Sequence, residues 1–349
     1  MSQLFYKERP LIGLDISQTS AKIMALTPKK WAVTGYGSVD LDPSKTSSPQ
    51  DLRGHLEGKL KELLTKHMVG RLPSRQAVVS VPTSRTFTRS LTLPREAEAD
   101  LMNAIQLEAE QYIPISMDQL YIDYQVIGTS KESLEVLMSA VPKLQVDTTL
   151  EACRAAGIEP IVVEPSINAV ARLIHEAEEG SLVTVILDIG ATATDIAILD
   201  KTIRVTGGVG VGGHTMTLAV MQELNLTHDA AHMLRTHNGL MVSPKQAAIH
   251  KALEPTLAKI VSETKKVMRY YTERLGKKAK IEQLIIVGGG SNIPGIGDYF
   301  TDNMIIAART ASPWQILDFG KLTPLSRQLK PRFITAIGLA MVNQKEVWQ

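Results

Sequence analysis

Residues 183–200 read VTVILDIGATATDIAILD, and the order of residue types in this stretch predicts a β-hairpin. The apolar β-formers stop at Asp188-Ile189-Gly190, small and hydroxyl-bearing residues follow, and a second apolar run begins with another carboxylate at Asp195. Two runs of β-formers separated by a short Gly-containing segment are typical of paired strands. The hairpin therefore places Asp188 at the end of one strand and Asp195 at the start of the next.

The same plan occurs a second time, near the N-terminus. LIGLDIS (11–17) is typical of a strand that carries Asp15, a polar turn follows at Gln18 to Ser20, and AKIMAL (21–26) resumes the strand pattern. Two matched hairpins far apart in the chain indicate two related domains.

The composition indicates a globular protein with room for two domains. The chain has 349 residues, of which 44% are hydrophobic, and 38 Lys and Arg against 36 Asp and Glu give a formal net charge of +2. This balance argues against nucleic acid as the main partner. The single cysteine, Cys153, cannot form an internal disulfide and fits a reducing compartment. Because the N-terminus has no secretory h-region and no apolar run reaches about 18 residues, we expect a cytoplasmic protein without a membrane span.

The segment between the hairpins predicts an inserted subdomain. A third strand is expected at residues 31–41 and a helix over 52–67. Residues 84–153 then have the pattern of a self-contained β-α-β-β-α unit. Its first helix should end before Pro114. The apolar residues at helical spacing in that helix are Leu101, Ile105, Ala109 and Tyr112.

After an acidic break at residues 176–181, the second hairpin opens a further domain. Helical patterns follow, including a long one over 254–276. Residues 281–300 read as a buried strand, a glycine turn and the start of a helix, and an apolar helix over 333–342 ends the pattern. Alternating strands and helices of this kind predict an α/β fold.

The turns of the two hairpins have the chemistry of a phosphate site. Tight turns of this kind point consecutive backbone N–H groups at one spot, which binds phosphate through their partial positive charge. A carboxylate beside a phosphate repels it unless a divalent cation lies between them, and Mg²⁺ is typically held by one or two carboxylates, water and phosphate oxygens. Asp15 and Asp188 are therefore candidate Mg²⁺ ligands. The alternative is that each only caps a turn, since Asp and Gly are ordinary turn residues.

A third segment adds a surface for a base. An apolar strand pattern at residues 285–287 is followed directly by Gly288-Gly289-Gly290-Ser291. Residues without a side chain let the backbone approach a flat ligand closely. Two phosphate turns and one base platform together predict a nucleotide held between two domains.

With these segments in place, the chain resembles a known superfamily. LDISQTSAKIMAL, LDIGATATDIAIL and IIVGGGSNIPG are similar to the phosphate-1, phosphate-2 and adenosine motifs of the actin-like ATPases, in their expected order. EAEQYIPISMDQLYIDYQVIG (108–128) and GGVGVGGHTMTLAV (207–220) resemble the PilM/FtsA group within that superfamily. The resemblance covers residues 11–342 and depends on the combination of motifs.

The resemblance implies an α/β, actin-like ATPase fold, in which two domains each contain a central mixed sheet flanked by helices. The first domain would comprise residues 9–83 and 154–180 and be closed by a C-terminal helix over 331–345. Residues 84–153 would form the inserted β-α-β-β-α subdomain, and residues 181–330 the second domain.

The resemblance also implies a set of residues for ATP. Asp15 and Asp188 would contact Mg²⁺ through water, and Lys22 would reach the phosphates. The phosphate donors would be Ser17, Gln18, Thr19, Ser20, Gly190, Ala191, Thr192 and Thr194. On the adenosine side the implied contacts are Gly212, Gly213, Glu263, Lys266, Gly289, Gly290 and Ser291. Glu164 would orient the attacking water, with Asp188 as the second catalytic residue, whereas outside this fold Glu164 and Glu263 would be ordinary solvated acids.

Three other motifs are weaker. Residues 208–213 satisfy G-x-G-x-x-G, but helices follow where a dinucleotide-binding βαβ unit needs another strand. Neither Gly58 nor Gly276 starts the G-K-[ST] sequence of a Walker A loop. His228 and His232 lie one helical turn apart, as zinc ligands can, yet the Glu that a zinc hydrolase needs is missing, which favours a solvated helix face.

The implied function is an ATP-binding scaffold of type IV pilus assembly, with at most weak ATPase activity. The bound nucleotide would set the angle between the domains, and the pilus machine would respond to that angle. In the PilM group, the N-terminal cytoplasmic peptide of a PilN-like membrane protein docks beside the insert and holds the protein at the inner membrane. Residues 85–92 and 101–112 would form the wall of that groove, and the alternative is that this helix simply packs on its own sheet.

Two other functions stay open. An FtsA-like, filament-forming division protein would normally end in an amphipathic membrane helix, whereas this chain stops at VNQKEVWQ. A small-molecule kinase of the same superfamily would need a carboxylate base that faces a sugar pocket, and no motif supplies one.

Overall fold

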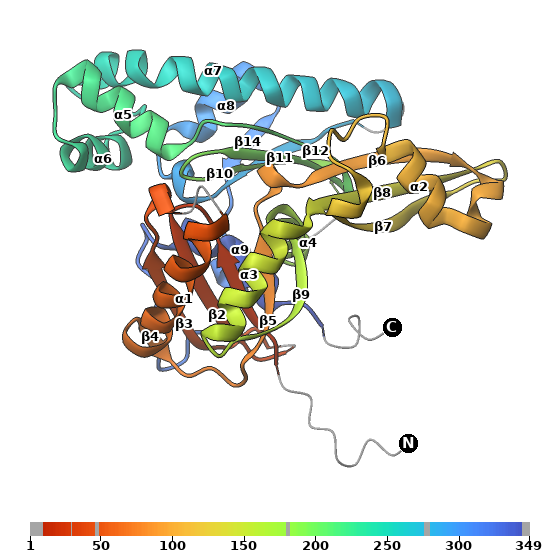
Figure 1. The fold of residues 1–349 in the computed structure, drawn as a ribbon. Helices are drawn as coiled ribbons and strands as arrows, with labels where there is room; N and C mark the ends of the chain where they lie inside the picture. The colour runs from red at the N-terminus through yellow and green to blue at the C-terminus, as the bar shows by residue number, and fades with distance from the viewer. Residues whose placement is uncertain (1–9, 29, 46–48, 179–181, 276–279, 344–349) are drawn as a thin grey trace. The chain divides into compact units, whose positions relative to one another are not determined.

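The computed structural model of the protein describes residues 10–28, 30–45, 49–178, 182–275 and 280–343 (Figure 1). The chain divides into two compact units. Unit 1 comprises Met1–Pro82, Leu144–Glu178 and Ser312–Gln349, and unit 2 comprises Thr83–Lys143 and Glu179–Ala311. Among the described residues, no helix is both long enough and apolar enough to span a bilayer.

Unit 1 is built on a six-stranded mixed sheet with the order β4-β3-β2-β1-β5-β9. The first predicted hairpin is confirmed as β1 and β2, which pair antiparallel at the centre of the sheet. On the β1 side of the hairpin, β5 and β9 run parallel to β1. On the β2 side, β3 and β4 are each antiparallel to the neighbouring strand. Their bounds are β1 (Ile12–Ile16), β2 (Ser20–Leu26), β3 (Val33–Asp40), β4 (Met68–Gly70), β5 (Gln76–Val81) and β9 (Glu159–Pro165).

Helices cover both faces of this sheet. On one face α1 (Pro49–Lys66) and α3 (Lys143–Ala155) enclose an apolar core with residues of β1 and β2. On the other face lie α4 (Ser166–Ala177) and α9 (Ile334–Ala340), which pack against each other. The sequence predicted α9 but not α4, because α4 follows β9 directly, has Pro165 at its N-cap, and shows no side-chain capping bond that would mark its start. The last two residues of the helix expected over 331–345 lie outside the described residues.

Unit 2 contains a second mixed sheet, with the order β12-β11-β10-β13-β14. The quoted hairpin is confirmed as β10 and β11, and the predicted strand before the glycine turn is β13, parallel to β10. The bounds are β10 (Thr184–Ile189), β11 (Thr194–Asp200), β12 (Thr202–Val209), β13 (Gln283–Val287) and β14 (Ala307–Thr310). The two hairpins thus occupy equivalent central places in two different sheets.

Four helices pack on this second sheet around one large apolar core. They are α5 (Gly213–Leu224), α6 (His228–His237), α7 (Gln246–Tyr270) and α8 (Ile296–Met304). The long helix expected from residue 254 begins earlier, at Gln246, and runs through Pro255. Its buried residues, such as Leu253, Leu257 and Ile260, recur at helical spacing on both sides of that proline, so packing outweighs the lost backbone hydrogen bond.

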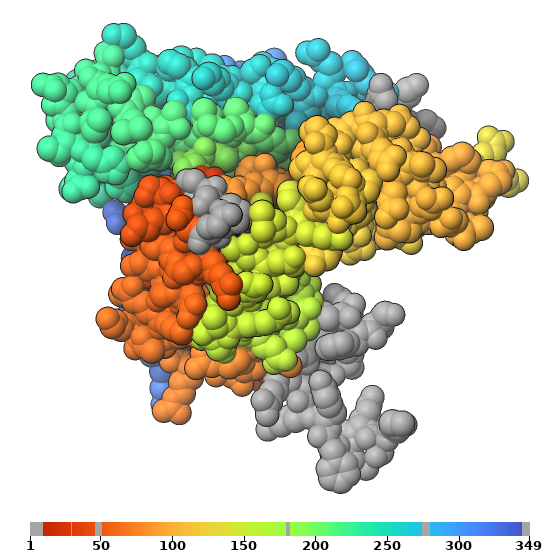
Figure 2. Space-filling view, viewed as in Figure 1, coloured from red at the N-terminus to blue at the C-terminus, as the bar shows by residue number. Residues whose placement is uncertain are grey.

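The insert has the β-α-β-β part of the predicted order within unit 2. Its sheet has the order β6-β8-β7 and is formed by β6 (Phe87–Pro94), β7 (Leu120–Thr129) and β8 (Ser133–Pro142). The helix α2 (Leu101–Ala109) ends before Pro114 as expected and buries Leu101, Ile105 and Ala109. Figure 2 shows the surface atoms of the insert in orange and yellow. Arg204 of β12 joins the insert to the rest of unit 2, because its guanidinium contacts Glu135 of β8 at 2.5 Å.

The two compact units divide the chain differently from the expected domain boundaries at three places. The insert, expected as a subdomain of the first domain, belongs to unit 2 with the second sheet. From Leu144 onward the last helix of the expected insert belongs to unit 1, because α3 buries Ala152 and Cys153 against the sheet of that unit. Residues from Ser312 also belong to unit 1, where the carbonyl of Asp318 accepts a hydrogen bond from the backbone of Val33.

Candidate functional site

The turn of the first hairpin is closed by its own hydrogen bonds. The backbone N–H of Ser17 donates to the carbonyl of Ser20 at 2.9 Å, and the Ser17 hydroxyl donates to the same carbonyl at 3.0 Å. The carbonyl of Thr19 accepts a bond from Leu41 at 2.9 Å. The two serine hydroxyls predicted as phosphate donors therefore contact each other, and Gln18 and Thr19 lie at the tip of the turn.

Asp15 lies in a row of polar side chains that crosses three strands of the sheet. Its cross-strand neighbour on β2 is Lys22, whose Nζ donates to Asp15 Oδ2 at 2.7 Å. On the other side, the hydroxyl of Ser80 on β5 donates to Asp15 Oδ1 at 2.9 Å. Asp15 and Lys22 are 7% and 5% exposed, so this is a buried ion pair with further hydrogen bonding.

Asp188 occupies the equivalent place in the second hairpin, but its neighbour differs. Asp188 lies directly opposite Asp195 in the β10–β11 pair. A bond from the backbone of Gly190 to the carbonyl of Ala193, 2.9 Å long, closes the turn between them. Both hairpins therefore place a carboxylate at the end of the first strand, facing the residue seven positions later. That residue is a lysine in the first hairpin and an aspartate in the second.

Asp195 is a buried carboxylate with a raised pKa. Burial, and secondarily the charge of Asp188, raise the pKa of Asp195 to about 7, although a hydrogen bond from the Thr83 side chain acts in the opposite direction. Its Oδ1 atom is shielded from solvent and has no hydrogen-bond partner among the described residues. Asp195 was not among the predicted site residues, and the signal that could have found it is the spacing of seven shared with Lys22.

The start of α5 is joined to the turn of the second hairpin. The backbone N–H of Gly213 donates to the carbonyl of Gly190 at 2.9 Å, and that of His214 donates to the carbonyl of Ala191 at 2.8 Å. The Thr194 hydroxyl donates to the carbonyl of Val211 at 2.8 Å and is fully buried. Thr194, a predicted phosphate donor, thus links the hairpin to the segment before α5.

The glycine turn after β13 packs on the same hairpin. Gly288 has φ +85°, and a side chain there would overlap the carboxylate of Asp188. A side chain at Gly290 would overlap Ile189. The hydroxyl of Ser291 donates to the carbonyl of Gly288 at 2.7 Å, which closes the turn and removes Ser291 as a free donor. The structure therefore brings together the predicted phosphate turn and the predicted base platform in unit 2.

Comparison with known proteins identifies the family. A sequence model described as type IV pilus assembly protein PilM matches residues 13–344. The chain belongs to the PilM family. A solved structure of the "PilM-PilN type IV pilus biogenesis complex" shares 23% identity with this PilM-family chain, with a TM-score of 0.80 over 95% of this chain and 98% of that one.

Two further solved structures share the fold at lower similarity. The ethanolamine utilization protein EutJ from Carboxydothermus hydrogenoformans has 14% identity and a TM-score of 0.53, over 96% of this chain and 90% of that one. MreB5 of Spiroplasma citri, solved bound to ADP, has 13% identity and a TM-score of 0.55 over 97% of each chain. These likenesses confirm the predicted actin-like fold of this PilM-family protein.

Arg235 of α6 is a residue beside the glycine turn that the sequence did not reveal. The turn between α5 and α6 is short, because Asn225 ends α5 in the left-handed conformation and Thr227 caps α6. Arg235 is 2% exposed, and burial lowers the pKa of its guanidinium to about 10. It donates to the carbonyl of Gly290 at 3.2 Å and to the hydroxyl of Thr217 at 3.1 Å. Arg235 therefore ties α6 and α5 to the glycine turn.

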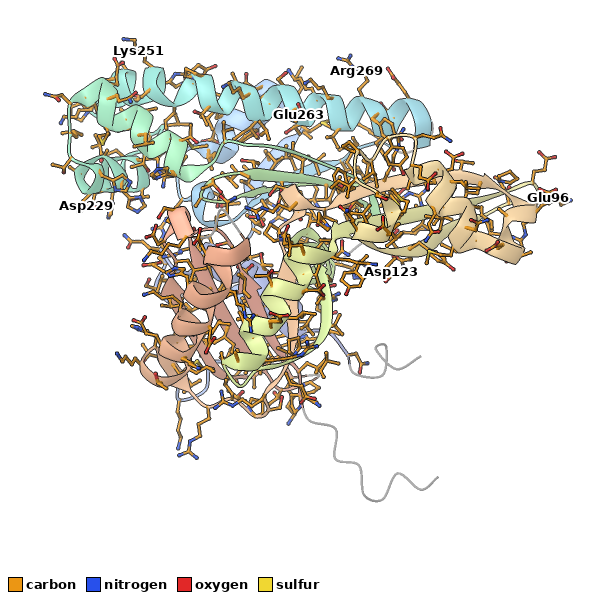
Figure 3. The ribbon with its side chains drawn as sticks, in the orientation of Figure 1. Glu96, Asp123, Asp229, Lys251, Glu263 and Arg269 are labelled. Atoms are coloured by element: carbon orange, nitrogen blue, oxygen red, sulfur yellow. The ribbon has the colours of Figure 1, made fainter. Side chains whose placement is uncertain are left out.

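The implied adenosine residues of α7 form an ion pair with each other. Lys266 donates to Glu263 at 2.9 Å, and its side chain is 65% exposed. Figure 3 shows Glu263 midway along α7. The basic side chain that contacts the glycine turn is Arg235 of α6, so a role of Lys266 at the adenosine stays a prediction. A single basic residue on a helix is a common surface feature, and only the packing of α6 distinguishes Arg235.

Glu164, the predicted water-orienting acid, forms an ion pair within unit 1. Both of its carboxylate oxygens accept bonds from the guanidinium of Arg172 on α4, at 2.8 and 2.7 Å. Arg172 donates in addition to the carbonyl of Gly338 on α9. This bidentate pair fixes β9, α4 and α9 together, and the water-orienting role of Glu164 stays a prediction.

The carboxylates of the two hairpins are the predicted contacts for a metal ion. Among the described residues, no group of three or more His, Cys, Asp and Glu side chains could hold one. A Mg²⁺ ion on a nucleotide needs only one or two carboxylates, which Asp188 with Asp195 can provide. Both oxygens of Asp15 accept hydrogen bonds, from Lys22 and Ser80, and a contact of Asp15 with Mg²⁺ through water stays a prediction.

The role of Arg235 can be tested by replacing it with methionine. We expect a loss of about 2 kcal/mol in the free energy of unfolding, because the carbonyl of Gly290 loses its buried donor. We also expect nucleotide affinity about 10-fold lower, because the glycine turn is no longer held. Calorimetric melting and titration measure both, and Arg269→Met on the exposed side of α7 is the matched control. Equal behaviour of the two variants would contradict the assignment.

Proposed function

We propose that this PilM-family protein is an ATP-binding scaffold of type IV pilus assembly that docks the N-terminal peptide of a PilN-like membrane protein. The observation that carries the nucleotide part is the network Gly190–Gly213–Thr217–Arg235–Gly290, which joins four chain segments. The amino end of α5 and two glycine-containing turns meet there, and such places bind anions and flat ligands.

The residues of this chain would bind ATP mainly through backbone groups. In unit 2 the turn at residues 190–192 and the start of α5 at Gly212 and Gly213 would contact phosphate and ribose, and Gly289 and Gly290 would contact the base. In unit 1 the turn at residues 17–20 and the ammonium of Lys22 would contact phosphate. A bound Mg²⁺ would neutralise phosphate charge, and Asp188 would hold it. ADP in the MreB5 structure supports a nucleotide in this fold.

Slow turnover is part of the proposal. Hydrolysis of a γ-phosphate depends on positioning and charge stabilisation. If the acid that should orient the attacking water is held by another residue, the protein can bind ATP well and still hydrolyse it at a negligible rate. Glu164 is committed to Arg172 by two hydrogen bonds. We therefore assign ATP the role of stabilising one arrangement of the protein, which a partner can distinguish.

The partner would be a short peptide from a membrane protein. The family match and the likeness to a solved PilM-PilN complex support this choice. Its docking would place this protein at the cytoplasmic face of the inner membrane. The insert is the expected contact, because the face of β7 opposite α2 carries Tyr121, which is 47% exposed.

Isothermal titration tests both parts. Mg·ATP is titrated into the protein with and without a synthetic peptide that carries the first residues of the PilN-like protein from the same organism. We expect binding of both ligands, and an ATP affinity that differs at least about 5-fold with the peptide present. Binding of neither ligand would overturn the proposed function, and binding of ATP without the peptide would restrict it to the nucleotide.

A further inference from the structure

The insert is connected through the chain to one unit and packs within the other. The chain leaves the sheet of unit 1 after β5 and returns to that unit at α3, yet residues 83–143 belong to unit 2. Within unit 2, β6 of the insert lies beside β12, the end strand of the second sheet (Figure 1). Because both covalent connections of the insert lead to unit 1, non-covalent contacts hold it on unit 2.

Arg204 of β12 makes such a contact with two strands of the insert. Its Nη2 donates to Glu135 Oε2 on β8 at 2.5 Å, and its Nη1 donates to the backbone carbonyl of Ile127 on β7 at 3.3 Å. The side chain of Arg204 is 13% exposed and that of Glu135 is 35% exposed. Partial burial makes the pair stronger than an ion pair in full solvent. One guanidinium thus links the second sheet to both β7 and β8.

The backbone of the insert is shaped to fit this guanidinium. The register of β7 with β8 shifts between Val126 and Gly128, which leaves Ile127 out of the pairing, so that its carbonyl can accept from Arg204. A Cβ atom at Gly128 would lie 2.9 Å from Glu135 Oε2, the oxygen that Arg204 contacts. A side chain at Gly128 would therefore displace that oxygen and weaken the contact.

A second contact joins the start of the insert to the hairpin of β10 and β11. The side chain of Thr83, the first residue of the insert in unit 2, donates a hydrogen bond to Asp195 of β11. Asp195 faces Asp188 across the hairpin, and β11 pairs on its other side with β12, the strand that carries Arg204. The insert is thus attached at two points to the strands that border the proposed phosphate turn of unit 2.

We propose that Arg204 is a positioning residue that holds the insert on the second sheet, so that the insert and the nucleotide-binding part of unit 2 move as one body. This inference rests on the proposed function, in which the insert contacts the peptide and the second hairpin contacts phosphate. A peptide bound to the insert then changes the ATP affinity through Arg204 and the strands β12 and β11, without touching the nucleotide.

The first test measures this coupling with a charge reversal and its rescue. The measured quantity is the ratio of the ATP Kd values with and without the peptide, which should be at least about 5-fold in the wild type. Arg204→Glu should bring this ratio to within about 2-fold of one, because it replaces attraction to Glu135 by repulsion. The double variant Glu135→Arg/Arg204→Glu restores the pair with exchanged charges and should recover most of the coupling.

Further variants separate the position of the insert from general stability. Arg204→Met removes the guanidinium without adding repulsion, and it serves if Arg204→Glu does not fold; it should lower the ratio in the same direction. Gly128→Ala should also lower the ratio, because the added Cβ atom displaces the Glu135 carboxylate. Lys251→Glu is the matched control, since it breaks an ion pair between α7 and Glu223 of α5 in the same unit. The control should keep the wild-type ratio.

A distance measurement tests the attachment without either ligand. Spin labels are placed at Leu107→Cys on α2 of the insert and at Lys259→Cys on α7, which are both exposed positions. The native Cys153 is buried and 0% exposed, so it does not compete for the label. Double electron–electron resonance should give a narrow distance distribution in the wild-type background and in the double variant. The distribution should be broader in Arg204→Glu and Arg204→Met, because the insert is no longer held.

Two coupling results would overturn the inference while the proposed function stands. One is a wild-type ratio in both Arg204→Glu and Arg204→Met, and the other is an equal loss of coupling in Lys251→Glu. A wild-type protein whose ATP affinity does not respond to the peptide would instead contradict the coupling in the proposed function. The distance measurement then decides the attachment, and equally narrow distributions in the Arg204 variants would overturn it.

Discussion

Replacing Asp188 by alanine is expected to lower the affinity for Mg·ATP at least about 100-fold while leaving the fold intact. Asp188 is the penultimate residue of β10, next to the turn, and its carboxylate lies against Gly288 of the glycine turn. Its removal takes away the side chain that would hold the metal at the phosphates. It also removes the charge that helps to raise the pKa of Asp195.

Titration calorimetry with Mg·ATP and far-UV circular dichroism measure the two parts of this prediction. Asp229→Ala is the matched control, because the Asp229 side chain on α6 is fully exposed. Figure 3 shows it at the end of the helix near α5. The control should bind as the wild type does. A change of less than about 3-fold for Asp188→Ala, similar to the control, would exclude Asp188 from the nucleotide site.

Replacing Gly338 by alanine is expected to destabilise unit 1 by about 3 kcal/mol or more. Gly338 lies in the middle of α9, and a Cβ atom there would overlap the backbone carbonyl of Ala169 on α4. Backbone cannot rotate away as a flexible side chain can, so the two helices would have to separate. Their separation would also break the bond from Arg172 to the Gly338 carbonyl.

A second glycine provides the matched control for Gly338. Gly58 lies within α1, where an added Cβ atom would meet nothing within 4 Å. Gly58→Ala should therefore stabilise the protein by about 0.5–1 kcal/mol, the usual gain of alanine over glycine in a helix. Urea unfolding followed by circular dichroism measures both. The same small gain for Gly338→Ala would show that α4 and α9 are not in the close contact described here.

Local sequence patterns were sufficient to predict the strands and turns that form the candidate nucleotide site. The two hairpins and the glycine turn were predictable because alternation of strands with small, polar or glycine residues is a local property. The helical spacing of Leu101, Ile105 and Ala109 likewise predicted the buried face of α2. The helix α4 was missed, because Pro165 joins it to β9 without a capping residue and its apolar residues continue the pattern of the strand.

Charge pairing was decided by tertiary structure. Lys22 and Asp15 are seven residues apart, and only the register of β1 with β2 shows that they face each other. Glu164 and Arg172 also meet only once α4 packs on the sheet, and Arg235 contacts Gly290 although 55 positions separate them. A charged side chain has a similar local pattern whether it is solvated or buried, so its role depends on neighbours from distant parts of the chain.

The sequence by itself therefore determined the family, the actin-like fold class and the segments that carry phosphate and base chemistry, because glycine turns and strand patterns require particular residues at adjacent positions. The tertiary structure alone decided that Asp15 pairs with Lys22 and that Asp188 faces Asp195. The energy of an electrostatic interaction depends on the distance between the charges and on their burial. Neither quantity can be read from the spacing of residues along the chain.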